Sequence, residues 1–345
     1  RVFVVTTRSV FGHSELFGRL RAHLGGRLAG CFPSIGQHAP ALAVAAAVDA
    51  ARSANADVLV SFGGGSPIDA TKSVAFALAT GLDLRLTDAA VRARSLHADG
   101  LLPHIAVPTT LSAAELSGLA GFTTEEDKEK VGLRGHALIP TTVIFDAELS
   151  LHTPIDLWLS TGIRAVDHAV ETVLASGNHP FSHVLALEAL RRLQASLLAT
   201  RAQPDDLRAR TESQLGAWFS FTLPGPAASG LSHTLGKRIG SRHDIPHGVS
   251  SCLVLPHVMR YLAPRRAPQL ARVAAALGVD VREMPVDRAA ACAADAVASL
   301  ITRLGLPTRL ADYGLNEHDL EAAARPVASD EYPFQDLLAI YQAAM

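Results

Sequence analysis

The chain has 345 residues, which is long enough for two ordinary domains and too long for a single hydrophobic core. Charged residues make up 19% and hydrophobic residues 48%, a balance that is typical of a compact globular protein and not of a disordered chain. A formal net charge of -2 predicts no broad attraction to nucleic acid or to an anionic membrane. Three scattered cysteines, with no signal peptide and no membrane-length apolar run, predict a cytoplasmic protein. Because Arg1 runs straight into a strand pattern, we expect the natural chain to begin before it.

The first 150 residues alternate between strand and helix patterns. Short β-branched runs are typical of buried parallel strands, and the alanine-rich stretch after Pro40 is typical of a helix. In chain order, strands are expected over 2–6, 28–32, 57–62 and 104–107, with helices over 14–24 and 41–54. This alternation predicts a doubly wound parallel sheet, and hence a dinucleotide-binding α/β domain over residues 1–150.

The pattern changes after residue 150. Long amphipathic helical stretches follow, with few strand signals. We therefore expect an all-helical C-terminal domain over residues 151–345.

A glycine-rich segment, Gly63-Gly64-Gly65-Ser66, stands between the predicted third strand and a helix. Glycines allow the backbone to approach a ligand closely, and the N-terminus of the following helix favours a pyrophosphate. The alternative is a plain tight turn, since the segment is neither a GxGxxG fingerprint nor a Walker loop. Strand, glycines and helix in this order favour phosphate binding.

Thr109 and Thr110 end another predicted strand at the same edge of the sheet. Their hydroxyls are placed to contact a ribose or a phosphate. A polar strand end without a ligand is the alternative.

Three histidines lie on short glycine-flanked segments of the C-terminal half: His168, His233 and His247. Arg164 shares a helical face with His168, and Lys237 shares one with His233, because residues four apart lie on the same side of a helix. A common site and three separate structural histidines both fit the sequence, which does not show that they converge. The other histidines, His13 and His152 among them, receive no predicted role.

Five motifs together resemble the iron-containing (group III) alcohol dehydrogenase superfamily, and most closely its maleylacetate-reductase-like branch. They are GGGSPIDATK at 63–72, PTT at 108–110, KVGL at 130–133, TGIRAVDHAVE at 161–171 and SHTLGKRIGSRHDIPHG at 232–248. The resemblance covers nearly the whole chain. It implies the dehydroquinate synthase-like fold, in which a dinucleotide-binding domain precedes an all-helical metal-binding domain.

The resemblance also implies roles for individual residues. Cofactor-binding positions fall on Gly63, Gly64, Gly65, Ser66, Asp69, Thr109, Thr110 and Lys130, and the family's three metal-binding histidines fall on His168, His233 and His247. The implied cofactor is NAD(H) or NADP(H), because the segment after the second predicted strand lacks the acidic residue that would disfavour a 2′-phosphate.

Two positions depart from the family pattern. Arg164 stands where the family has an aspartate metal ligand, and Lys237 stands where it has a histidine assigned to proton relay. An arginine about 5 Å from a divalent ion repels it by roughly 6 to 7 kcal/mol at an effective dielectric constant of about 20. We therefore expect an iron or zinc ion to be absent or weakly held.

These observations predict an NAD(P)-dependent oxidoreductase that acts on a carbonyl, an alcohol or a keto acid such as maleylacetate, and that forms a homodimer. Arg164 would polarise the carbonyl or hold a substrate carboxylate, and Lys237 or a histidine would supply the proton. Alternatively, Arg164 forms a salt bridge with Asp167 or Glu171 on its own helix. The sequence also leaves open a metal-dependent alcohol dehydrogenase with a three-histidine site, a redox-neutral dehydroquinate-synthase-like lyase, and a non-catalytic nucleotide-binding relative.

Overall fold

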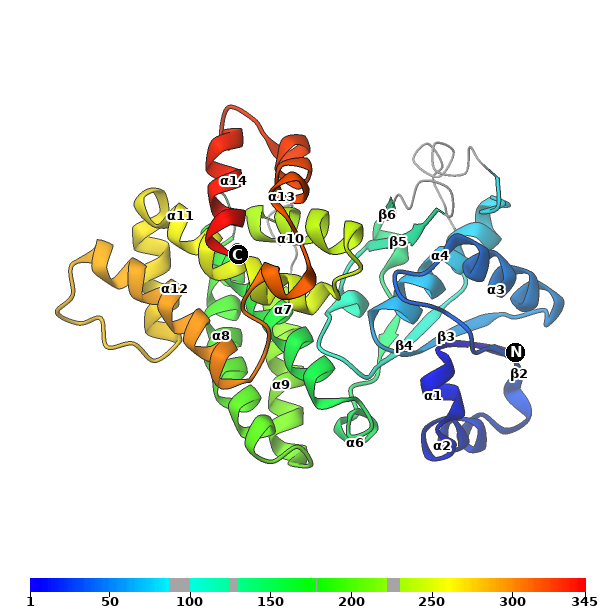
Figure 1. The fold of residues 1–345 in the computed structure, drawn as a ribbon. Helices are drawn as coiled ribbons and strands as arrows, with labels where there is room; N and C mark the ends of the chain where they lie inside the picture. Colours follow the sequence, from blue (N-terminus) through cyan, green and yellow to red (C-terminus); the bar gives the residue numbers. More distant parts are fainter. Residues whose placement is uncertain (87–99, 125–129, 176, 178, 222–229) are drawn as a thin grey trace. The chain divides into compact units, whose positions relative to one another are not determined.

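A computed structural model describes residues 1–86, 100–124, 130–175, 177, 179–221 and 230–345, apart from the side chains of Ser14 and Lys130 (Figure 1). These residues form two compact units, Arg1–His152 and Thr153–Met345. None of the described helices is both long and apolar enough to cross a bilayer.

The first unit is built on a parallel sheet of five strands in the order β2-β1-β3-β4-β7. The strands are β1 (Val2–Thr6), β2 (Leu28–Phe32), β3 (Val58–Gly63), β4 (His104–Pro108) and β7 (Thr142–Val143). The helices are α1 (Arg8–Gly12), α2 (Ser14–Leu24), α3 (Ala41–Ser53), α4 (Gly65–Thr80) and α6 (Ala147–Ser150). The predicted strands and helices are confirmed, and each end lies within one residue of the predicted position. Sequence reasoning did not predict β7 or the antiparallel pair β5 (Leu119–Thr123) and β6 (Lys130–Arg134).

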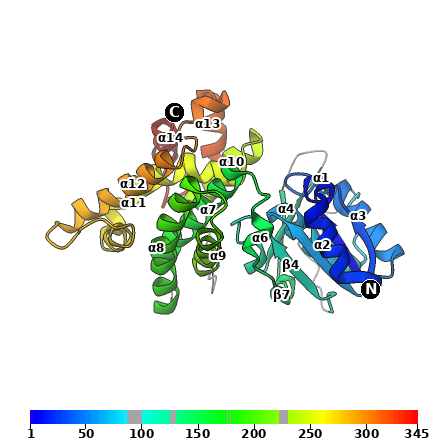
Figure 2. The same cartoon turned by 90° about the horizontal axis from the view of Figure 1, so that it is seen from below.

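Strand β1 is buried on both faces, which explains its unbroken apolar run. Phe3 and Val5 pack in a core with residues of α3 and α4, whereas Val2 and Val4 pack in a second core with residues of α1 and α2. Figure 1 shows these two pairs of helices on opposite sides of the sheet, and Figure 2 shows α1 and α2 from below. The sheet is therefore doubly wound, as the strand–helix alternation predicts.

The strand order reverses between β1 and β3. From β1 the chain continues to β2 on one side of the sheet, and from β3 it continues to β4 on the other. The carboxyl ends of these two neighbouring strands are held in register at Thr6 and Phe62, where the Thr6 hydroxyl donates to the Phe62 carbonyl at 2.6 Å. Open parallel sheets bind ligands outside the carboxyl ends of strands at such a reversal. The glycine segment at 63–66 leaves the sheet at this point.

In the described residues of the second unit, every regular element is a helix. The longer ones are α7 (Ile155–Leu174), α8 (Pro180–Ala202), α9 (Leu207–Phe221), α10 (Leu231–Arg242), α11 (His247–Ala276), α12 (Val286–Arg303), α13 (Glu317–Ala324) and α14 (Phe334–Ala343). Helix α7 is buried from Trp158 to its end and packs against α8, α9 and α11. This burial allows polar side chains of α7 to contact neighbouring helices instead of water.

Helices α7 and α11 approach each other closely at Gly248. A Cβ atom at this position would lie 2.5 Å from the carbonyl carbon and oxygen of Ser160, and a backbone cannot move as a flexible side chain can. Only glycine therefore fits at the start of α11.

We predict that Gly248→Ala lowers the free energy of unfolding by about 1–3 kcal/mol, because overpacking forces the two helices apart. Gly18→Ala is the matched control, since a Cβ on this residue of α2 meets no atom within 4 Å. The control should be neutral or stabilising by about 0.5–1 kcal/mol. Urea denaturation measures both variants, and equal stability of Gly248→Ala and wild type would contradict the close approach.

Candidate active site

The glycine segment of the first unit forms the connection from β3 to α4. Gly64 is the residue before the helix, and Gly65 is its first residue. A Cβ at Gly64 would lie 3.0 Å from a side-chain carbon of Thr110, and one at Gly65 would lie 3.1 Å from the Ser112 hydroxyl. Gly63 has a φ of 140°, in the region that favours glycine. The segment therefore presents bare backbone at a helix N-terminus, which suits a phosphate.

The predicted threonine pair lies beside this segment. Thr109 donates its backbone N–H to the Gly63 carbonyl at 2.9 Å. Both threonine side chains are buried, and within the described part of the chain the Thr110 hydroxyl has no hydrogen-bond partner. The structure therefore brings together the glycines and both threonines. Asp69 lies one turn further along α4, while Lys130 begins β6 opposite Thr123 and its side chain is outside the described residues.

A buried lysine fixes the chain that follows the threonines. The Lys72 ammonium donates to the carbonyls of Ala114, Ser117 and Leu119 at 2.6, 2.7 and 2.8 Å. Burial lowers the pKa of Lys72 to about 8, so the group stays charged at neutral pH and keeps three donors. Sequence reasoning quoted this lysine in a motif but gave it no role.

In the second unit, α7, α10 and α11 bring the three predicted histidines together. The rings of His168 and His233 stack with centroids 5.1 Å apart, and those of His233 and His247 lie edge to face at 6.1 Å. Arg164 reaches the same place, where its Nη2 contacts His233 Nε2 and lies 3.4 Å from His247 Nε2. We call these four residues the arginine–histidine cluster.

Asp167 and two serines form a hydrogen-bonded group around the other terminal nitrogen of the guanidinium, Nη1. The Asp167 carboxylate is fully buried and accepts from Ser251 at 2.7 Å and from Ser232 at 3.1 Å. The Arg164 Nη1 donates to the Ser251 hydroxyl at 3.0 Å and lies 3.6 Å from Asp167 Oδ2. The salt bridge on the same helix and the contact with the histidines are thus formed by the two nitrogens of one guanidinium.

Glu171 positions His233 through the backbone. Its carboxylate accepts from the backbone N–H groups of Gly230 at 2.6 Å and His233 at 3.1 Å, and so caps α10. The same carboxylate lies 3.7 Å from His233 Nδ1. Burial and the nearby Asp167 raise the pKa of Glu171 well above its usual range.

The imidazoles of His168 and His233 are neutral at physiological pH. Burial, followed by the Arg164 charge, lowers the pKa of both groups well below 6.5. A neutral imidazole has one donor and one acceptor nitrogen. His233 therefore accepts from Arg164 at Nε2, and its Nδ1 carries the proton on the side of Glu171.

Comparison with known proteins gives the family. Residues 1–147 match the family described as iron-containing alcohol dehydrogenase, and residues 158–345 match its C-terminal part. The chain belongs to this family. It is 33% identical to a maleylacetate reductase of Rhizobium sp. (strain MTP-10005) and 31% identical to one of Burkholderia cepacia, in each case over 96% of the chain and 84% of the relative. The family assignment makes it an NAD(P)-dependent oxidoreductase.

Solved structures of relatives support the fold. The chain superimposes on a maleylacetate reductase from Rhizobium sp. strain MTP-10005 with a TM-score of 0.80 and 30% identity, covering all of this chain and 89% of the other. A putative alcohol dehydrogenase from Ralstonia eutropha JMP134 gives a TM-score of 0.84 at 29% identity with the same coverage. An alcohol dehydrogenase from Oenococcus oeni gives 0.93 at 23% identity, over all of this chain and 92% of the other, which shows the fold alone.

The side chains of the arginine–histidine cluster do not fit a divalent metal ion. The Arg164 guanidinium lies between the imidazole nitrogens that would bind such an ion, and arginine does not give up its charge. In the part of the chain that the structure describes, the one group of three histidine, cysteine or carboxylate ligands within 4.8 Å of one another lies elsewhere. The nitrogens of His168, His233 and His247 do not all lie within that distance of one another.

Several residues of the site were not predicted. Ser232 and Ser251 approach Asp167 only through folding, and Thr6 reaches the sheet edge beside Phe62 only through the strand order. Asp167 was named from the sequence as a salt-bridge partner of Arg164, three residues away on the same helix, and the structure has this pair at 3.6 Å. Lys237, by contrast, lies on the exposed side of α10, although its charge acts on His233.

A buried carboxyl beside the glycine segment gives a pH-dependent prediction. Glu115 is completely buried, and burial raises its pKa to about 7. The folded chain holds this proton more tightly than the unfolded chain, so the stability that it contributes is present below about pH 4.5 and is lost as the pH rises through 7. Glu115→Gln should therefore gain stability relative to wild type between pH 5 and pH 8, by on the order of 2 kcal/mol.

Urea denaturation at the two pH values measures this difference. Glu148→Gln is the control, because Glu148 is an exposed carboxylate of the same unit. Between the two pH values, the stability of Glu148→Gln relative to wild type should change less than that of Glu115→Gln. A Glu115→Gln variant that behaves like the control would disprove the raised pKa.

Proposed function

We propose that the chain reduces a small carboxylate-bearing ketone or enone of the maleylacetate type with NADH or NADPH, and that Arg164 takes the place of a catalytic metal ion. The observation that carries the proposal is the guanidinium of Arg164 among the imidazoles of His168, His233 and His247. The printed names of the relatives support the substrate class, since several are maleylacetate reductases.

Arg164 is suited to an anionic substrate. Its Nη2 contacts histidine nitrogens, and a charge-assisted hydrogen bond to a carboxylate or a developing alkoxide is roughly twice as strong as a neutral one. An arriving substrate oxygen can therefore displace a histidine contact. Asp167 and Ser251 hold Nη1 on the opposite side, so that the guanidinium keeps its orientation.

The glycine segment fits the phosphates of a dinucleotide. A Cβ atom on Gly64 or Gly65 would press against Thr110 or Ser112, so the backbone at the α4 N-terminus stays bare, and the Thr110 hydroxyl is buried beside it without a partner in the described residues. When bound, the nicotinamide supplies the hydride. The residues of the chain bind the pyrophosphate, orient the substrate and supply a proton.

The proton comes from the region of Lys237 and the neutral histidines. Lys237 shares a face of α10 with His233, and its charge helps to lower the pKa of that histidine. An ammonium group can donate a proton to the substrate oxygen, and Lys237 is exposed, so it regains one from water.

We predict that Arg164→Ala lowers kcat/KM for a keto-acid substrate by about 100-fold or more, because it removes the donor that stabilises the developing negative charge. Arg164→Lys keeps the charge but loses the two-nitrogen fork, so we expect a loss of about 10-fold or more. The dissociation constant for NADH, measured by fluorescence, should remain close to that of wild type. Steady-state kinetics and circular dichroism of each variant separate a catalytic loss from misfolding.

Metal analysis tests the same proposal in the wild-type protein. Activity should survive removal of divalent ions by a chelator, and added Fe²⁺ or Zn²⁺ should not raise it. An ion that is required for turnover and is lost in His233→Ala would refute the role of Arg164 as the cation.

We predict that Lys237→Ala lowers kcat by about 100-fold and leaves the dissociation constant for NADH unchanged, since general acid catalysis contributes about 10² to 10⁴ in rate. Arg238→Ala is the control, because it removes the neighbouring exposed positive charge of α10. Steady-state kinetics would rule out Lys237 as the proton donor if both variants had the turnover of wild type.

A further inference from the structure

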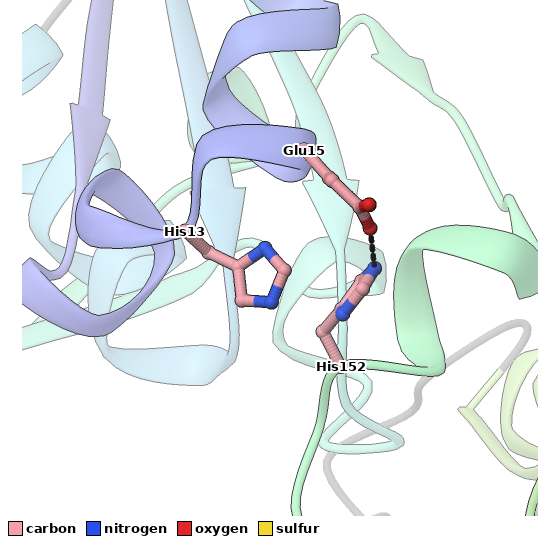
Figure 3. A group of neighbouring side chains, drawn as sticks. All are labelled: His13, Glu15 and His152. Atoms are coloured by element: carbon pink, nitrogen blue, oxygen red, sulfur yellow. Dashed lines mark ion pairs between the residues drawn. The ribbon is translucent and has the colours of Figure 1, made fainter.

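Two histidines and a glutamate meet on the first unit, and none of them belongs to the glycine segment or to the arginine–histidine cluster. His13 lies between α1 and α2, Glu15 is in the first turn of α2, and His152 follows α6. Figure 3 shows the three side chains pointing toward one another. The imidazole centroids are 4.0 Å apart, and His152 Nε2 lies 3.6 Å from Glu15 Oε2.

The three side chains are of types that bind metal ions. Each offers one ligand atom, and these atoms lie within 4.8 Å of one another. Zn²⁺ bonds to histidine nitrogen and carboxylate oxygen at about 2.0–2.2 Å, so ligands of a tetrahedral ion lie roughly 3.3 Å apart. The observed atoms therefore need to close by about 1.5 Å at most to reach the spacing of such a site. The Glu15 side chain, which is 73% exposed, is free to make that movement.

The donor types select the class of ion. Imidazole nitrogen suits Zn²⁺, Ni²⁺ and Cu²⁺, whereas Ca²⁺ and Mg²⁺ take oxygen ligands. Two histidines and one glutamate also match a ligand set found in zinc enzymes, in which water occupies the fourth position.

Hydrogen bonds and charge within the protein do not by themselves account for this arrangement. The Nδ1 atom of His13 is buried and has no hydrogen-bond partner within the described residues. The imidazole of His152 lies 3.6 Å from the Glu15 carboxylate, and the imidazole of His13 lies beside it, with ring centroids 4.0 Å apart and ring planes tilted by 51°. A metal ion binds imidazoles and a carboxylate together, and so accounts for the meeting of all three side chains.

We propose that His13, Glu15 and His152 bind a divalent transition-metal ion, with Zn²⁺ as the reference ion. The site joins the corner between α1 and α2 to the last residue of the first unit. A bound ion links these two segments and so stabilises the first unit, and the site is independent of the reduction that we assign to the arginine–histidine cluster.

Zn²⁺ binding to the full chain tests the site. The protein is first stripped with a chelator and then titrated with Zn²⁺ alone, in competition with a chromophoric chelator. Wild type should bind one equivalent with a dissociation constant in the micromolar range or below. His13→Ala and His152→Ala should each weaken binding at least tenfold, and Glu15→Gln should weaken it less. His23→Ala, which removes an exposed histidine of the same helix α2, should bind as wild type does.

A second measurement keeps the result clear if a variant folds poorly. Zn²⁺ should raise the thermal unfolding midpoint of wild type and of His23→Ala, but not that of Glu15→Gln to the same extent. Circular dichroism without metal shows whether each variant is folded.

The outcomes for this site and for the proposed function are separable. Unchanged Zn²⁺ affinity in folded His13→Ala and His152→Ala would overturn the site, whatever the enzyme's activity. Loss of Zn²⁺ in His233→Ala, but not in His152→Ala, would also overturn it and would place the ion at the arginine–histidine cluster. Loss of Zn²⁺ binding in His152→Ala, with reductase activity retained, supports the site and leaves the role of Arg164 intact.

Discussion

The site of the second unit depends on the buried positive charge of Arg164 and on its pairing with carboxylates. Burial lowers its pKa, and the carboxylates of Asp167 and Glu171 act in the opposite direction and keep it charged. A lone buried charge would cost several kcal/mol, and pairing with hydrogen-bonded carboxylates is what makes it tolerable. His168 and His233 are neutral because of the same burial and the same arginine. The positive charge of the cluster is thus concentrated on Arg164, and contacts with Asp167 and Ser251 fix the orientation of its guanidinium.

The first unit uses a buried cation in a similar way. The Lys72 ammonium donates hydrogen bonds to three carbonyls of the segment that follows the threonine pair, and so fixes the backbone beside the glycines. Carbonyl oxygens are ready-made acceptors for an ammonium with three donors. The backbone beside the glycine segment is therefore fixed by a charge that does not itself need to touch the ligand.

Much of the fold could be predicted because its signals are local. The β-branched run of β1, the glycines before α4 and the histidines on short glycine-flanked segments are all visible in the sequence. Contacts between distant segments are not visible in this way. Ser251 reaches Asp167 from α11, and His152 reaches His13 from the far end of the first unit. Neither pair has a spacing that sequence periodicity can detect. His13 and His152 were therefore left without a predicted role.

The resemblance to a metal-dependent family indicated the positions of the site, but charge decides what each position can do. A guanidinium at a ligand position does more than delete one bond to the metal, because it places a permanent positive charge where the ion would lie. Replacing such a buried, paired charge by apolar residues is often neutral or stabilising, so stability alone gives no reason to keep it. Arg164 also faces imidazoles on one side and a carboxylate on the other. This asymmetry directs one nitrogen of the guanidinium toward the histidines, and a hydrogen bond from that nitrogen to an anionic oxygen would be stronger than one to a neutral imidazole.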